Sequence, residues 1–364
     1  MALRDTDQTP SVRQDGFGAR CIVSDPRLGR VERLDLTPDL STSVSEQAIR
    51  ARAAHLTSVE ESPLGRVLRI QRKGDALSVL SEAPDGVSLS DLLAALEFKT
   101  ITLTGDDLLE LAASVVTAVA TMHERLPALA HGALTPAHIC LLRDGTTMLT
   151  GAVYGDALQA LQRNREHLWR EFGVALPAAA SLPRFDQRGD VTQLGAVVLA
   201  ITTRRSLRRD EYPRSTSELA TTATVSAIAA IDSKLRTWLQ DALLLHGRVV
   251  FTSAVEAARA FRDILPAASG QNGAEPLALQ AAIRQLCGEP ETPASADSAT
   301  ARTKLRRPPG QASQIADMPP AGWAAPLVAA RASVDEIEDI EEIQESAGSA
   351  FTFLRSLLPH LRAS

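Results

Sequence analysis

The chain has 364 residues, with 38 Lys and Arg against 44 Asp and Glu, which gives a formal net charge of −6 at pH 7. Hydrophobic residues make up 45% and charged residues 23% of the chain, a composition that excludes wholesale disorder and fibrous architectures. The acidic balance argues against nucleic acid as a partner, because proteins bind phosphate backbones with a basic excess. A single core stops growing near ~250–300 residues, so this length favours two domains or one domain with appendages.

Membrane insertion and disulfide or metal frameworks are also unsupported. The longest nearly apolar stretch, residues 108–122, contains Glu110 and is shorter than the ~20 residues that a membrane span needs. The first residues contain no apolar run of the kind that drives export, so we expect a cytoplasmic protein without a membrane partner. The three cysteines are Cys21, Cys140 and Cys287. Because they are odd in number and far apart in the sequence, we expect neither disulfides nor a metal site.

The first quarter of the chain alternates β-like runs with one helix. A turn at residues 25–29 separates runs at 19–23 and 31–36, and a turn at Lys73, Gly74 and Asp75 separates runs at 66–70 and 76–80. Residues 43–56 are rich in Ala and Arg without a helix breaker, and Ser45 is the candidate helix start. Two hairpins and one helix predict a small α+β lobe.

From Leu89 onward the apolar residues recur at helical spacing. This periodicity predicts helices at 92–96, 108–122, 158–172, 191–201, 225–245 and 253–265, with one hairpin between 139 and 150. The segment after Pro266 mixes Gly, Pro, Ser, Ala and Thr, and contains one short candidate helix at 277–286. We therefore divide the chain into 12–86, 87–265, a largely disordered linker 266–333, and a helical terminal segment 334–364.

Three short motifs follow one another in the helical part. They are HGALTPAHI at 131–139, LTGAV at 149–153 and DVTQLG at 190–195. Their order and spacing resemble the catalytic loop, the metal-binding Asp-Phe-Gly and the later helix start of protein kinases, in particular bacterial Ser/Thr kinase domains. Gly16-Phe17-Gly18 resembles the end of the glycine-rich loop more weakly. The resemblance implies a two-lobed α+β fold, with a β-rich N-lobe at 12–86 and a mainly helical C-lobe at 87–265.

The positions that carry the chemistry of kinases hold other residues in this chain. Phosphoryl transfer needs a Lys on the phosphates, an Asp that accepts a proton, and Asp and Asn as magnesium ligands. The resemblance places Leu34 or Asp35 at the Lys, Ala133 at the catalytic Asp, His138 at the Asn and Gly151 at the metal-binding Asp, and no lysine precedes Lys73. The glutamate that pairs with the Lys corresponds to a position near Arg52. Residues with architectural roles are retained at His131, Pro136, Asp190 and Gly195.

This combination predicts a pseudokinase, which is a kinase-like domain without phosphoryl transfer. We expect no catalytic residue, no bound ATP and no metal, and a role as scaffold or regulator through a protein partner in bacterial signalling. The alternative is an atypical Ser/Thr kinase or ATP-binding protein with rearranged site residues. An unrelated structural module is the third hypothesis.

Two segments are candidates for partner binding. Six acidic residues in 334–344 surround Ile337, Ile340 and Ile343, so that the segment is either a solvated helix face or a helix that docks on a basic partner or on the chain itself. An apolar stripe between 158 and 176 either packs in the core or faces a partner. Residues 155–180 contain no Ser, Thr or Tyr, which argues against regulation by phosphorylation there.

Overall fold

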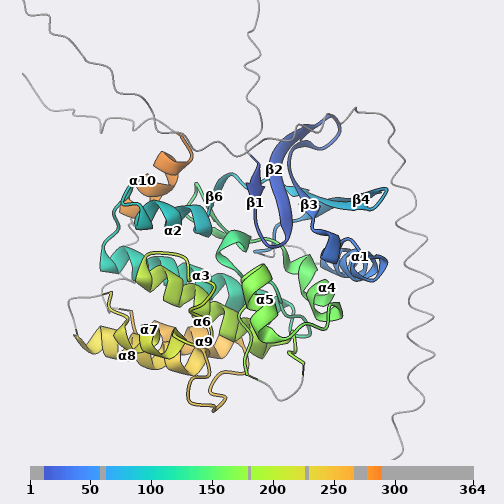
Figure 1. The fold of residues 1–364 in the computed structure, drawn as a ribbon. Coiled ribbons are helices and arrows are strands. Elements are labelled where there is room, and N and C mark those ends of the chain that lie inside the picture. The colour runs from blue at the N-terminus through green and yellow to red at the C-terminus, as the bar shows by residue number, and fades with distance from the viewer. Residues whose placement is uncertain (1–11, 58–62, 179–181, 226–228, 266–276, 289–364) are drawn as a thin grey trace, which may run out of the picture. The chain divides into compact units, whose positions relative to one another are not determined.

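The computed structural model describes residues 12–57, 63–178, 182–225, 229–265 and 277–288. Most of the predicted linker and the whole acidic segment, with Ile337, Ile340 and Ile343, lie outside the described residues. Within the described part, a small β-rich lobe precedes a mainly helical one, which confirms the predicted two-lobed α+β class (Figure 1). No helix in this part of the chain combines the length and the apolarity needed to cross a membrane.

The N-lobe is a five-stranded antiparallel sheet with one helix. The strand order is β1-β2-β3-β5-β4, formed by β1 (Arg13–Gln14), β2 (Gly18–Asp25), β3 (Gly29–Leu36), β4 (Val67–Lys73) and β5 (Ala76–Glu82). Both predicted hairpins are confirmed, and Gly29 and Gly74 adopt positive φ values of 76° and 59° in their turns. Helix α1 (Ser43–Thr57) is confirmed, but its predicted start at Ser45 is wrong, because the Thr42 hydroxyl accepts the Ser45 N–H at 3.1 Å.

The C-lobe is built around a long buried helix. Helix α3 (Gly105–Arg125) begins with a capping box between Thr104 and Asp107, and its apolar face packs against α6 (Gln187–Thr203) and α9 (Ala254–Arg262). The predicted hairpin is present as β7 (Ile139–Leu142) and β8 (Thr147–Leu149). An unpredicted strand, β6 (Gly86–Ser88), pairs with β7, so that the strand order is β6-β7-β8. The other helices are α2 (Leu89–Glu97), α4 (Gly155–Ala160), α5 (Arg165–Phe172), α7 (Thr216–Thr222), α8 (Ala229–Ala242) and α10 (Leu277–Leu286).

Two helical predictions for the C-lobe are wrong in detail. The single helix expected at 158–172 is two helices, α4 and α5, because Gln162 has a left-handed φ of 51° and the Asn164 side chain caps α5. The helix expected at 225–245 is the shorter α8, while α7 was missed because its residues, mainly Thr, Ser and Ala, have little apolar periodicity. The apolar stripe of 158–176 packs in the core, which confirms the first of its two interpretations.

The two lobes share one buried cluster of apolar side chains. Phe17, Leu34 and Ile49 of the N-lobe belong to the same cluster as Tyr154 and Phe172 of the C-lobe. A second, larger cluster fills the C-lobe around α3 and α6. The loop between α3 and β7 therefore lies against a shared core, and the candidate site lies at this boundary.

Candidate functional site

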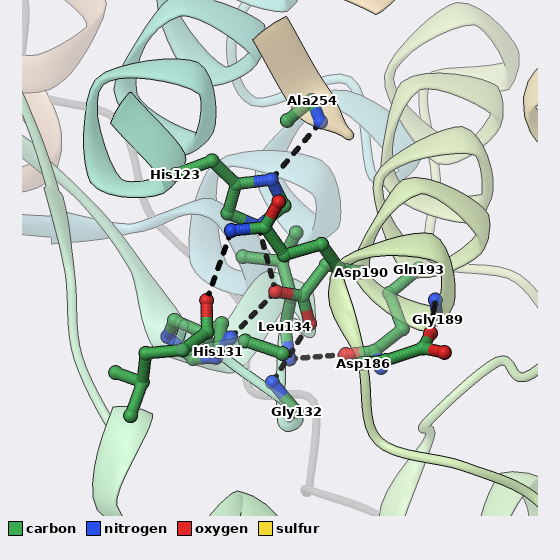
Figure 2. Close-up of polar contacts among 12 residues, drawn as sticks. His123, His131, Gly132, Leu134, Asp186, Gly189, Asp190, Gln193 and Ala254 are labelled. Atoms are coloured by element: carbon green, nitrogen blue, oxygen red, sulfur yellow. Dashed lines mark hydrogen bonds and ion pairs between the residues drawn. The ribbon is translucent and has the colours of Figure 1, made fainter. Parts of the chain in front are cut away.

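The loop between α3 and β7 is held by a buried carboxylate. Asp190, in the first turn of α6, is fully buried and accepts hydrogen bonds from the backbone N–H groups of His131 at 2.5 Å and Gly132 at 2.7 Å (Figure 2). Its third contact is with His123 Nε2 of α3, at 2.9 Å. Asp190 therefore anchors the backbone of this loop from the first turn of α6.

One turn later, Gln193 holds the next part of the same loop. Its Oε1 accepts the Leu134 N–H at 2.6 Å (Figure 2). Gly195 allows α6 to approach the end of α8, because a Cβ at this position would lie 3.0 Å from the Leu243 side chain. Pro136 begins the short 3-10 turn Pro136–His138, where its fixed φ suits the first position. These contacts fix the shape of the loop without any reactive group.

His138, at the position of a magnesium-binding Asn, is a buried neutral histidine. Its Nδ1–H donates to the Ala133 carbonyl at 2.7 Å, so that Nε2 accepts from the Arg20 guanidinium at 3.0 Å. Burial, followed by the charge of Arg20, holds the pKa of the His138 imidazole well below its usual range. Both ring nitrogens are therefore already engaged.

Gly151, at the position of the metal-binding Asp, lies against the same ring. Its φ is 75°, and a Cβ built on it would lie 2.8 Å from the His138 ring. A side chain at 151 and an imidazole at 138 cannot occupy this space together without a shift of one of them. The two departures from the kinase pattern thus fit each other.

Ala133 and Leu34, at the catalytic Asp and phosphate-binding Lys positions, lie in the apolar core. Ala133 is 0% and Leu34 2% exposed, and both belong to the cluster shared by the lobes. The neighbouring Asp35 is turned away and pairs with Arg33 at 2.7 Å on the other side of the strand. Of the two residues predicted for the Lys position, Leu34 is the one whose side chain is buried between the lobes.

The turn between β1 and β2 inserts an aromatic ring between the lobes. Phe17 is 1% exposed and its ring centroid lies 4.5 Å from that of His138 and 5.4 Å from those of Tyr154 and Phe172. The backbone at Gly16 presses on the end of α5 so closely that a Cβ there would lie 1.7 Å from the Glu171 carbonyl oxygen. Together these residues form what we call the Phe17 plug, comprising Gly16, Phe17 and the three rings around Phe17.

Charged residues fill the neighbouring part of the boundary. Arg20 of β2 pairs with Glu32 at 2.5 Å and with Asp15 at 3.0 Å, in addition to its contact with His138. A cavity of about 150 Å³ remains beside this network, lined also by Arg13 and Arg30. It is well below the ~300–1,000 Å³ of ordinary small-molecule sites.

Arg52 of α1 connects the helix to the loop and to the segment after β8. Its guanidinium donates to the backbone carbonyls of Ala130 and Ala152, and pairs with Asp156 at 2.6 Å. The residue is only 5% exposed. Sequence analysis placed it near the glutamate that pairs with a lysine in kinases, whereas here an arginine contacts the loop directly.

The His131 ring, in the same loop as His138, is also held in its neutral form. Burial, assisted by the Arg52 charge and against the effect of Asp190, lowers the pKa of His131 to about 4. Its Nδ1 accepts the Ala133 N–H at 3.3 Å.

The arrangement does not fit a magnesium–nucleotide complex. Magnesium prefers oxygen ligands, and the two ligand positions hold an engaged imidazole and a glycine. The nearby carboxylates of Asp15 and Glu32 are paired with Arg20. Across the ranges that the structure describes, no group of three His, Cys, Asp or Glu side chains could hold a metal ion.

Comparison with known proteins supports the architecture. No protein-family model and no curated protein matches the sequence. The kinase domain of maize sucrose-induced receptor kinase 1 (SIRK1), solved with AMP-PNP, is similar in structure with a TM-score of 0.50 and 17% identity, over 70% of this chain and 92% of that one. The chain has a protein-kinase-like fold. The kinase domain of Mycobacterium tuberculosis PknI is also similar, with a TM-score of 0.48 and 17% identity, over 72% of this chain and 99% of that domain.

Four residues of the site make contacts that the sequence did not predict. Phe17 was treated only as part of a weak glycine-loop match, although an aromatic residue between two glycines is an available signal. The roles of Arg20 and Arg52 depend on contacts with residues 118 and 78 positions away in the sequence, which no local pattern predicts. Gln193 lies inside the DVTQLG motif, but its buried amide becomes visible only in the structure.

Proposed function

We propose that this chain is a kinase-like domain that transfers no phosphate and acts through protein binding, as a scaffold or regulator. The observation that carries the proposal is the Phe17 plug, together with the His138 ring against Gly151. These groups occupy the boundary between the lobes at the positions where the kinase pattern has its phosphate and metal ligands.

Entry of a nucleotide requires that the plug be displaced. Exposing a buried Phe side chain costs about 1.5–3 kcal/mol, and each aromatic pair adds about 0.5–1.5 kcal/mol. Phe17 makes three such pairs, and Arg20 must also leave His138, Glu32 or Asp15. A nucleotide has to offset these costs without a lysine or a magnesium ligand at the usual positions.

The loop itself supports a protein-binding role. Asp190 and Gln193 hold its backbone through three hydrogen bonds although none of its side chains is equipped for phosphoryl transfer. A retained shape without the chemistry is typical of a domain that works by presenting its surface. Bacterial signalling remains the context that we propose from the kinase resemblance.

One observation favours the alternative, a nucleotide-binding protein with rearranged residues. The cavity of about 150 Å³ is lined by three arginines, Arg13, Arg20 and Arg30, which suit an anionic ligand. Arg20 is already paired with two carboxylates, so we rank this function second.

The experiment that separates the two functions is a thermal titration of the full chain with ATP, with and without Mg²⁺ or Mn²⁺. Any ligand that prefers the native state raises the Tm by mass action. We expect no shift in Tm up to millimolar nucleotide. A metal-dependent shift would contradict the proposal, and a phosphoryl-transfer assay would then decide whether the domain is an atypical kinase.

A further inference from the structure

Helix α10 lies against the connection between the two lobes. It follows the C-lobe in the chain and comprises Leu277–Leu286. Its contacts are with α3, the central helix of the C-lobe, and with β6 (Figure 1). The same compact unit contains α10 and both lobes. The helix is therefore part of the fold, although it lies beyond the residues that resemble a kinase domain.

One face of α10 is buried in the C-lobe core. Leu279 and Ala282 are each 6% exposed and Ile283 is 1% exposed, and all three belong to the large apolar cluster around α3 and α6. Their spacing of three and four residues forms one stripe along the helix, which we call the α10 stripe. On the other face, Ala281 and Gln285 are exposed. Apolar packing of a single face therefore attaches α10 to the C-lobe.

Strand β6 is the link between the lobes. Strand β5 ends at Glu82 and β6 begins at Gly86, so that three residues join the N-lobe sheet to β6. Val87 is buried in the same cluster as the α10 stripe. Gly86 and Ser88, whose positions alternate with Val87 along the strand, line the cavity of about 150 Å³ between the lobes. Strand β6 therefore has the C-lobe core on one face and the boundary between the lobes on the other.

A cysteine lies close to α10, β6 and the N-lobe. Cys140 of β7 pairs with Ser88 in the sheet, is 5% exposed and lines the same cavity. Burial, followed by the charges of Glu32 in the N-lobe and Cys287 after α10, raises the pKa of the Cys140 thiol to about 12. Cys287 itself packs, partly buried, against the C-lobe cluster. Because a buried and protonated thiol reacts slowly, the reactivity of Cys140 reports any opening at this point.

We propose that α10 acts as a strap that fixes the connection between the lobes, and that release of α10 opens the boundary between them. A strand of three residues makes few ladder hydrogen bonds, so its position depends on the packing of its faces. The α10 stripe supplies part of this packing on the Val87 face. Without the stripe, β6 and the three residues before it can shift, and the N-lobe gains freedom relative to the C-lobe. The inference goes beyond the proposed function and holds whether or not the chain binds a nucleotide.

Thiol labelling of the full chain tests the strap. Leu279→Asp combined with Ile283→Asp places two carboxylates in the stripe, which should release α10 because an unpaired charge is costly to bury. Ala281→Asp combined with Gln285→Asp is the matched control, with the same spacing and the same added charge on the exposed face. With N-ethylmaleimide and peptide mapping, we expect Cys140 to react at least tenfold faster in the stripe variant than in the unmodified chain. The control variant should stay within twofold of the unmodified chain, and equal rates in the two variants would overturn the strap.

Two further measurements separate a strap from a general loss of stability. Amide exchange should show that α10 has lost its protection in the stripe variant, and an α10 that stays protected would contradict its attachment through the stripe. The labelling rate of Cys140 should then change less than twofold between 0 and about 1 M urea, because a local opening exposes little new surface. A rate that rises steeply with urea would mean that labelling requires global unfolding. That result, or an unchanged rate with α10 released, would overturn the strap.

A milder variant keeps the test decisive if the stripe variant does not fold. The stripe variant must retain a cooperative unfolding transition in urea above the concentrations used for labelling. If it does not, Ile283→Ala takes its place, because this change removes buried contacts without adding a charge. Cys140 should then react about threefold faster than in the unmodified chain, again without dependence on urea. An unchanged rate in a folded Ile283→Ala chain would overturn the strap.

Discussion

At the residue scale, an imidazole at position 138 is compatible only with a very small residue at position 151, which is a glycine in this chain. The imidazole is oriented by the Ala133 carbonyl and Arg20, and its ring fills the space that a side chain at 151 would need. An Asn and an Asp at these positions would leave oxygen atoms free for a cation. The present pair leaves a neutral ring in an apolar surrounding that includes Phe17.

The neutral histidines predict that the domain loses stability in mild acid. His131 and His138 have pKa values below their usual range in the folded chain and ordinary values near 6.5 when unfolded. Below pH 6.5 the unfolded chain therefore binds more protons than the folded chain, and the free energy of unfolding decreases as the pH is lowered. Two such groups together lower the free energy of unfolding by about 3 kcal/mol between pH 6.5 and pH 5.

Urea unfolding across this pH range measures the effect. His138→Asn removes one of the two titrating groups and should reduce the pH slope by about half, whatever its effect on stability at neutral pH. A free energy of unfolding that stays constant between pH 6.5 and 5 would show that the rings are not held neutral.

At the scale of elements, α1 is attached to the C-lobe by a side chain. Arg52 reaches the loop before β7 and the segment after β8, and α1 also packs against α4 (Gly155–Ala160). In kinases the corresponding helix is tied to the nucleotide site through a Lys–Glu pair. Here the helix contacts the backbone of the loop directly, so its position does not depend on a ligand.

Replacement of Arg52 should therefore loosen the contact between the lobes. Arg52→Met leaves buried carbonyls of Ala130 and Ala152 without a donor, and we expect a loss of about 3 kcal/mol in the free energy of unfolding. Arg50→Met, in the same helix, removes an exposed pair with Glu46 and should cost less than about 1 kcal/mol. Equal losses in urea unfolding of the two variants would contradict the role of Arg52.

Elements with local signals were predictable from the sequence, while those that depend on distant contacts were not. The turns at Gly29 and Gly74 can be recognised from a few neighbouring residues, whereas the Thr104–Asp107 cap of α3 was not predicted and the helix begins earlier than expected. The break between α4 and α5 depends on a single left-handed residue, Gln162, which apolar spacing does not reveal. At the site, the sequence motifs led to the prediction that the residues of phosphoryl transfer are replaced, and this stays a prediction. The insertion of Phe17 and Arg20 followed only from the packing of one lobe on the other.

At the scale of the whole described unit, the lobes are joined by a core rather than separated by an open cleft. Phe17, Leu34 and Ile49 continue the apolar cluster of Tyr154 and Phe172, and the charged network around Arg20 lies beside it. A fixed relation between the lobes suits a surface that is presented to another protein.

The central claim is that the chain's own side chains fill the space between the lobes, and the most direct measurement is a crystal structure grown with millimolar AMP-PNP and Mg²⁺. We expect the Phe17 ring to lie against His138, Arg20 to pair with Glu32, and no nucleotide to lie between the lobes. A structure with Phe17 displaced and a nucleotide in its place would contradict it.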